Sequence, residues 1–75
     1  MTQTVYVTVA RYAHDNSATT SAALTADSCI AGLLPMAETD QHDYISRVVR
    51  ELGPDSTALV YTDGDLYVRV DRHTV

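Results

Sequence analysis

The chain of 75 residues contains no lysine, phenylalanine or tryptophan, and Cys29 is its only cysteine. A lone cysteine cannot form a disulfide within the chain, which excludes the disulfide-stabilised class of small secreted domains. No apolar run approaches the roughly 20 residues that a membrane-spanning helix needs. No signal-peptide pattern is recognised either, so we expect a soluble protein of the reducing cytoplasm that has no contact with a membrane.

The missing lysines leave five arginines against ten Asp and Glu residues, and the net charge is −5. Binding to nucleic acid phosphates depends on Lys and Arg, so we do not expect direct nucleic-acid binding. An acidic chain is attracted instead to basic surfaces, which makes another protein with a basic surface the expected partner. Acidity also keeps a small protein soluble, and both interpretations of the charge stay open.

The short length limits both the number of domains and their stability. A chain of this size forms one domain, which we place over residues 1–75. Such a domain buries only about 60% of the surface of its unfolded chain, and its core supplies roughly 3–5 kcal/mol. Because disulfides are excluded, further stability would come from a metal or from a second chain, identical or different.

The first strand is predicted over residues 4–12, where β-branched and aromatic side chains alternate in TVYVTVARY. Residues 14–17 predict the turn that follows, because Asp, Asn and Ser readily hydrogen-bond their own backbone. We expect the valines of this strand to face a helix. The outer face of the strand then carries Tyr6, Thr8, Ala10 and Tyr12.

Asp63-Gly64 predicts a type I′ hairpin turn between strands over 57–62 and 65–71. Cross-strand partners share a face of the sheet. The expected core face carries Leu59, Tyr61, Leu66, Val68 and Val70. The expected outer face carries Ala58, Val60, Thr62, Asp65, Tyr67, Arg69 and Asp71. We interpret Asp63 as a turn residue rather than as a metal ligand, because hard cations require six or more oxygen atoms.

The clearest helix is predicted over residues 39–52, with Thr39 or Asp40 as its N-cap. Its apolar residues form one buried stripe at helical spacing, which consists of Ile45, Val48, Val49 and Leu52. Residues 17–36 are ambiguous. One interpretation is a helix capped by Thr20 or Asp27; the other, which we favour, is an edge strand over 18–24 and then a loop or brief helical turn over 28–34.

These elements predict an α+β domain of two layers, in which one main helix covers one face of an antiparallel sheet. No motif for catalysis, for a cofactor or for a metal is recognised in the chain. Cys29 is expected to be a small buried side chain. His14, His42 and His73 fall on different predicted elements and match no zinc-ligand spacing with Cys29. We therefore expect no enzymatic activity, no cofactor and no bound metal.

The outer face of the sheet is the predicted partner-binding surface, because one helix cannot cover both faces. Exposed tyrosines are typical of protein interfaces, although ordinary cross-strand pairing on a wet sheet is the alternative. The predicted binding residues on the strands are Tyr6, Tyr12, Val60, Tyr67, Asp65 and Asp71. Two further binding carboxylates are predicted at Asp40 and Asp43. The carboxylates at positions 40, 43, 55, 63, 65 and 71 would imitate phosphates where they cluster in space.

The first functional hypothesis is a non-enzymatic protein-binding module that covers a basic surface of a nucleic-acid-binding complex. Small acidic inhibitors encoded by phages act in this way, anti-CRISPR and other anti-defence proteins among them, and the similarity lies only in size, charge and the lack of a catalytic motif. The alternative is a structural or regulatory homo-oligomer without catalytic activity, such as a symmetric homodimer.

Overall fold

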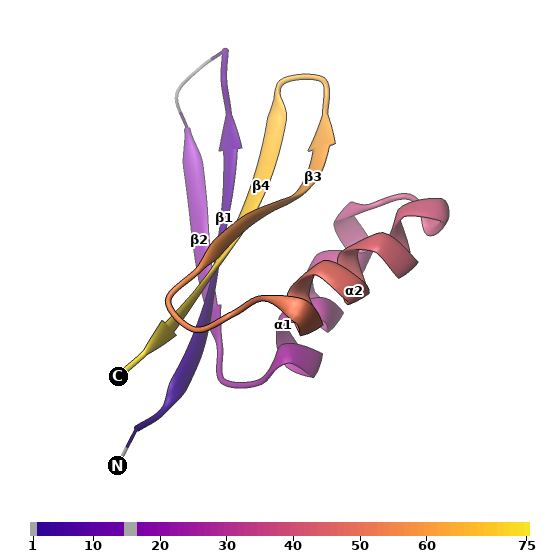
Figure 1. The fold of residues 1–75 in the computed structure, drawn as a ribbon. Coiled ribbons are helices and arrows are strands. Elements are labelled where there is room, and N and C mark those ends of the chain that lie inside the picture. The colour runs from indigo at the N-terminus through magenta and orange to yellow at the C-terminus, as the bar shows by residue number, and fades with distance from the viewer. Residues whose placement is uncertain (1, 15–16) are drawn as a thin grey trace.

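The computed structural model describes residues 2–14 and 17–75 as a four-stranded antiparallel sheet with two α-helices on one side of it (Figure 1). The strands lie in the order β2-β1-β4-β3. Their bounds are β1 Thr4–Tyr12, β2 Ala18–Ala23, β3 Thr57–Asp63 and β4 Leu66–Thr74. The helices are α1 Ala26–Leu33 and α2 His42–Glu51, and between them lie the 3-10 turns η1 Leu34–Met36 and η2 Thr39–Gln41. The predicted α+β fold is confirmed.

The hydrophobic core lies between the two helices and the face of the sheet that they cover. Strands β3 and β4 contribute Val60, Val68 and Val70, and each of these side chains is fully buried. The helices contribute Ile30, Leu33, Ile45 and Val49. The guanidinium of Arg72 on β4 donates a hydrogen bond of 2.7 Å to the carbonyl oxygen of Leu52, which joins the sheet to the end of α2.

The ambiguous segment 17–36 contains both a strand and a helix. The predicted edge strand is confirmed as β2. The segment expected to form a loop or brief helical turn over 28–34 belongs to a longer helix, because α1 spans eight residues. Neither Thr20 nor Asp27 is the N-cap. Thr25 occupies that position, and its hydroxyl accepts a hydrogen bond of 3.1 Å from the backbone N–H of Ser28. Three residues of α1, Cys29, Ile30 and Leu33, are buried against the sheet.

The predicted helix over 39–52 is present, with a different start. Residues 39–41 form η2, so Thr39 and Asp40 are not N-caps of α2. Gln41 precedes α2 without a side-chain cap. The buried stripe is confirmed, because Ile45 and Val49 are fully buried and Leu52 is nearly so.

The β3–β4 hairpin differs from the predicted register at two points. The turn residues are Gly64 and Asp65, with Asp63 paired to Leu66, and Gly64 has the positive φ of 58° that a type II′ turn needs at its first position. A register shift between Leu59 and Tyr61 leaves Val60 as an extra residue, which is a β-bulge.

The bulge changes which side chains of β3 are buried. Val60 is only 1% exposed and belongs to the core, whereas Leu59 is 51% exposed on the opposite face. The predicted exposure of Val60 and the predicted burial of Leu59 are therefore both wrong. The predicted outer position of Ala58 is also wrong, because Ala58 packs against the core.

The predicted faces of β1 are reversed. Thr8 and Ala10 pair with Val70 and Val68 of β4, so their side of the strand is the side that the helices cover. Tyr6 is accordingly only 7% exposed, with the guanidinium of Arg72 5.9 Å from its ring centroid. The alternation was recognised correctly, but it could not show which set of side chains faces the helices.

The uncovered face of the sheet carries the valines of β1 instead of its tyrosines. Tyr67 lies on this face opposite Arg11, while Tyr12 pairs with Leu66 and belongs to the other face. Tyr12 and Tyr67 are 43% and 45% exposed, but they do not form one aromatic cluster.

The predicted turn over 14–17 includes positions 15 and 16, which lie outside the described residues. Within those residues, none of the helices is long and apolar enough to cross a membrane.

We predict that Ile45→Ala lowers the free energy of unfolding by about 2–5 kcal/mol, because it leaves a cavity at a fully buried position. That loss is comparable to the whole stability of a core of this size. Leu24→Ala is the matched control, because Leu24 is 61% exposed and its truncation should change stability by less than about 0.5 kcal/mol. Urea unfolding followed by circular dichroism measures both variants; equal losses would contradict this description of the core.

Candidate functional site: an acidic hollow beside strand β3

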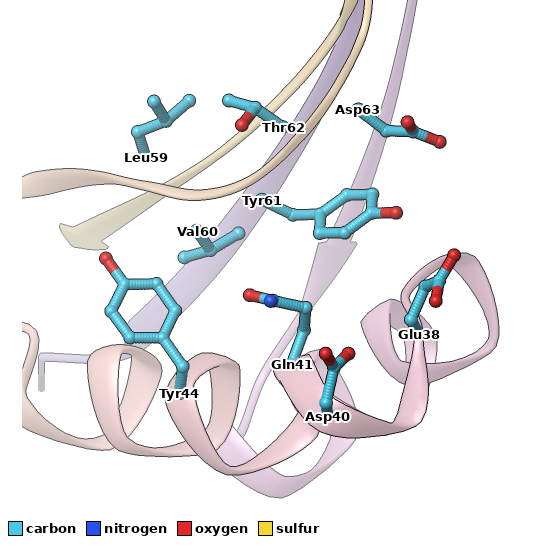
Figure 2. A pocket seen from close by; sticks show the side chains of 9 residues that line it. All are labelled: Glu38, Asp40, Gln41, Tyr44, Leu59, Val60, Tyr61, Thr62 and Asp63. Atoms are coloured by element: carbon cyan, nitrogen blue, oxygen red, sulfur yellow. The ribbon is translucent and has the colours of Figure 1, made fainter.

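A hollow of about 370 Å³ opens between strand β3 and the segment that leads into α2 (Figure 2). In Figure 2 the side chains of the helical segment point up toward the strand, and Tyr61 extends over them. Leu59 and Thr62 point away from the helices at the margin of the hollow. Nine described residues line it, which are Glu38, Asp40, Gln41, Tyr44, Leu59, Val60, Tyr61, Thr62 and Asp63.

Local structure brings these side chains together from two distant parts of the chain. The short turn η2 follows an extended residue, Glu38, and thus presents Glu38 and Asp40 toward the sheet before α2 begins. On the other side, the β-bulge places Val60 and Tyr61 on the helix side of β3. Asp63 follows at the end of the same strand. The hollow therefore depends on both the turn before α2 and the bulge.

The charge of the hollow is negative. Three of the nine lining residues carry carboxylates, Glu38, Asp40 and Asp63, and none of the nine is basic. Partial desolvation is the largest cause that raises the pKa of Tyr61, and the negative charges of these three carboxylates raise this pKa further. The tyrosine thus stays neutral and offers a hydroxyl group beside the carboxylates.

A cationic group fits this arrangement chemically. Carboxylates accept hydrogen bonds from guanidinium or ammonium groups, and such bonds are stronger than those between neutral groups. The ring of Tyr44, over which Arg47 lies at 6.0 Å, adds an aromatic surface at the same opening. The hollow is thus suited to an arginine or lysine side chain of another molecule.

The predicted carboxylate sites do not gather in one place. Asp40 lies in the hollow, but Asp43 is exposed on α2 and is not among the lining residues. Asp65 lies at the tip of the β3–β4 hairpin, 3.0 Å from Nδ1 of His14. Asp71 lies on the uncovered face, where it accepts a hydrogen bond from the hydroxyl of Thr57. Of the carboxylates predicted to imitate phosphates, only Asp40 and Asp63 lie in the hollow, where Glu38 joins them.

Seven of the nine lining residues were not among the predicted binding residues, which included only Asp40 and Val60 of this set. Glu38 and Asp40 stand two apart at the start of the predicted helix, which was a usable signal for a local acidic pair. Tyr61 was assigned to the core and Asp63 to the turn, because the bulge and the shifted turn could not be seen in the alternation.

The remaining candidate residues are held by contacts within the fold. The Sγ atom of Cys29 lies 3.6 Å from the hydroxyl of Thr8 in the core. Nε2 of His42 lies 3.1 Å from the carbonyl oxygen of Leu34 and donates to it. Arg50 pairs with Asp27 at 2.6 Å, which neutralises one of the exposed arginines of α2. Over residues 2–14 and 17–75, no group of three or more His, Cys, Asp or Glu side chains could hold a metal ion.

No family model, curated protein sequence or solved structure matches this chain. The functional argument is therefore built from the geometry and chemistry of the hollow.

We predict that Tyr61 titrates above the ordinary tyrosine pKa of about 10. The raised pKa favours the neutral phenol in the folded state, so its contribution to stability is complete below about pH 10 and is lost as the pH rises through the folded pKa. Absorbance titration of the wild type against Tyr61→Phe isolates this group. Asp63→Asn should lower the pKa of Tyr61, and Asp43→Asn should leave it unchanged. Equal titration midpoints of Tyr61 in the wild type and in Asp63→Asn would contradict the effect of the Asp63 charge on this tyrosine.

We also predict slow reaction of Cys29 with a thiol reagent in the native protein. The side chain is 4% exposed, and burial raises the pKa of its thiol, an effect that the hydrogen bond with Thr8 partly offsets. Little reactive thiolate is then present near neutral pH. Labelling with a disulfide reagent should accelerate strongly when urea unfolds the chain. Rapid labelling of the folded protein would show that the core opens at this position.

Proposed function

We propose that this chain is a non-enzymatic protein-binding module that captures an arginine or lysine of a partner protein in the acidic hollow. The observation that carries the proposal is the joining of three carboxylates and two tyrosines in one opening that contains no basic lining residue. The net charge of −5 acts in the same direction, because it attracts a basic partner over a longer range.

A partner with a basic surface commonly uses that surface to bind nucleic acid. A module that covers the surface would then act as an inhibitor by occlusion. We propose this role, that of a small acidic inhibitor of the phage-encoded kind against a nucleic-acid-binding complex, such as an anti-CRISPR or other anti-defence protein. Asp40, Glu38 and Asp63 take the place of phosphates in the proposal.

The two tyrosines give the hollow more than charge. Tyr61 supplies a neutral hydroxyl, and Tyr44, a residue that is 44% exposed, supplies an aromatic ring. Arginine combines a planar guanidinium with a preference for aromatic faces and carboxylates, so arginine fits better than lysine. The preferred partner surface therefore has an arginine at its centre.

The test is an affinity capture from lysate of the source cells, with wild-type protein and two hollow variants, Asp40→Asn and Asp63→Asn. We expect a basic protein on the wild type, a reduction of roughly tenfold or more in each hollow variant, and steep loss of binding with added salt. Asp43→Asn removes a carboxylate from α2 outside the hollow and should retain the partner.

The purified partner then allows a second measurement. Because the module and nucleic acid would compete for one basic surface, the module should lower the partner's affinity for nucleic acid, and Asp40→Asn should lower it less. Partner binding that is insensitive to salt, or equal in Asp40→Asn and Asp43→Asn, would refute capture by the hollow.

A further inference from the structure

A second hollow lies on the uncovered face of the sheet and is lined by arginines instead of carboxylates. It has a volume of about 350 Å³. Its floor is formed by apolar and aromatic side chains, and its two charged lining residues are Arg11 and Arg69. No acidic residue is among the described residues that line it. The chain thus presents an acidic hollow and a basic hollow on opposite sides of the sheet.

Leu59 connects the two hollows, because it belongs to the lining of both. The bulge at Val60 turns Leu59 out of the core at strand β3, which is an edge strand of the sheet. With 51% of its surface exposed, Leu59 is a large apolar side chain at an open sheet edge. The edge of β3 therefore has an apolar centre, with the carboxylates of the acidic hollow on one side and Arg69, which is paired with Asp71, on the other.

Such a surface is complementary to a second copy of itself. A twofold axis beside Leu59 and parallel to β3 reverses the faces of the second copy, so the acidic hollow of one copy lies beside the basic hollow of the other, and the same contact recurs by symmetry. The two Leu59 side chains then lie near the axis and shield each other from water. An arrangement of this kind closes at two copies, so it does not propagate into a fibre.

Arg69 is the arginine best placed for this contact. It lies on β4, directly opposite Leu59 in the sheet. Its side chain is 52% exposed, and its ion pair with Asp71, at 3.1 Å, lies on the surface. A surface pair of this type contributes little stability, so Arg69 can exchange Asp71 for a carboxylate of another molecule at small cost.

We propose that the edge around Leu59 is a dimer interface, in which Arg69 of each copy enters the acidic hollow of the other. The other edge strand, β2, contributes Ala18 to the lining of the second hollow, but it lacks charged residues and does not border the acidic hollow, and it is therefore not the edge that we assign. The inference rests on the same acidic hollow as the proposed function, so dimer formation and partner capture exclude each other at that hollow.

Sedimentation of the purified protein over a range of concentration and salt tests the proposal. At low salt we expect twice the chain mass of 8.2 kDa at high concentration, and a return to one chain mass as salt is added. Arg69→Glu should raise the dimer dissociation constant roughly a hundredfold. The twofold symmetry means that two equivalent contacts are lost, and the loss of each contact raises the dissociation constant about tenfold. Arg50→Glu makes the same charge change on α2, away from both hollows, and should leave the dimer intact.

A charge exchange separates this contact from a general effect of charge. Arg69→Glu combined with Asp40→Arg restores an opposite pair across the interface and should dimerise more tightly than Arg69→Glu alone. Circular dichroism confirms that each variant is folded. A wild type that stays monomeric at low salt, an unchanged dimer in Arg69→Glu, or no recovery in the double variant would overturn the proposal.

The same variants keep the two proposals distinguishable. Arg69 does not line the acidic hollow, so Arg69→Glu should abolish self-association while the basic partner is still captured. Asp40→Asn should weaken both. A monomeric wild type that binds its partner would refute the dimer alone, and a dimer that binds no basic protein would refute the proposed function alone.

Discussion

The β-bulge at Val60 is the feature on which the rest of the site depends. One extra residue in β3 keeps Val60 and Tyr61 both on the helix side of the strand and turns Leu59 to the other side. Val60 completes the core against the helices, Tyr61 borders the acidic hollow, and Leu59 becomes an exposed apolar side chain. A regular strand would have to bury either Val60 or Tyr61 and expose the other. The bulge thus determines both the packing of Val60 in the core and the exposure of Tyr61 and Leu59 at the surface.

The helical layer is small, and this size limits what the sheet can bury. Two short helices cover one face, and nearly all fully buried side chains lie between them and that face. The other face keeps partly exposed valines from β1 and the basic hollow around Arg11 and Arg69. The two hollows differ in the same way, because the hollow lined by carboxylates lies on the helix side. The molecule therefore offers two chemically different surfaces that meet at Leu59.

Both proposals use that difference between the hollows. A basic partner and a second copy of the chain each supply a cation to the acidic hollow, so they would compete for it. The attraction of the hollow for a cation comes from carboxylates that no lining residue neutralises, together with the neutral hydroxyl of Tyr61. Self-association of this kind would protect the hollow until a basic partner with higher affinity is present. Salt weakens both contacts, because both rest on exposed opposite charges.

The sequence by itself determined the types of the strands and of helix α2, because periods of two and of 3.6 are local properties, but it left the segment that contains α1 ambiguous. The alternation in 4–12, the stripe of Ile45 and Val49 and the Gly64 turn were enough to predict an α+β domain. Only the tertiary structure decided which face of β1 is buried, where β3 bulges, and that Glu38 and Asp63 share one hollow. These features depend on how strands pair and on which face the helices cover, and neither is encoded in the pattern of a single segment.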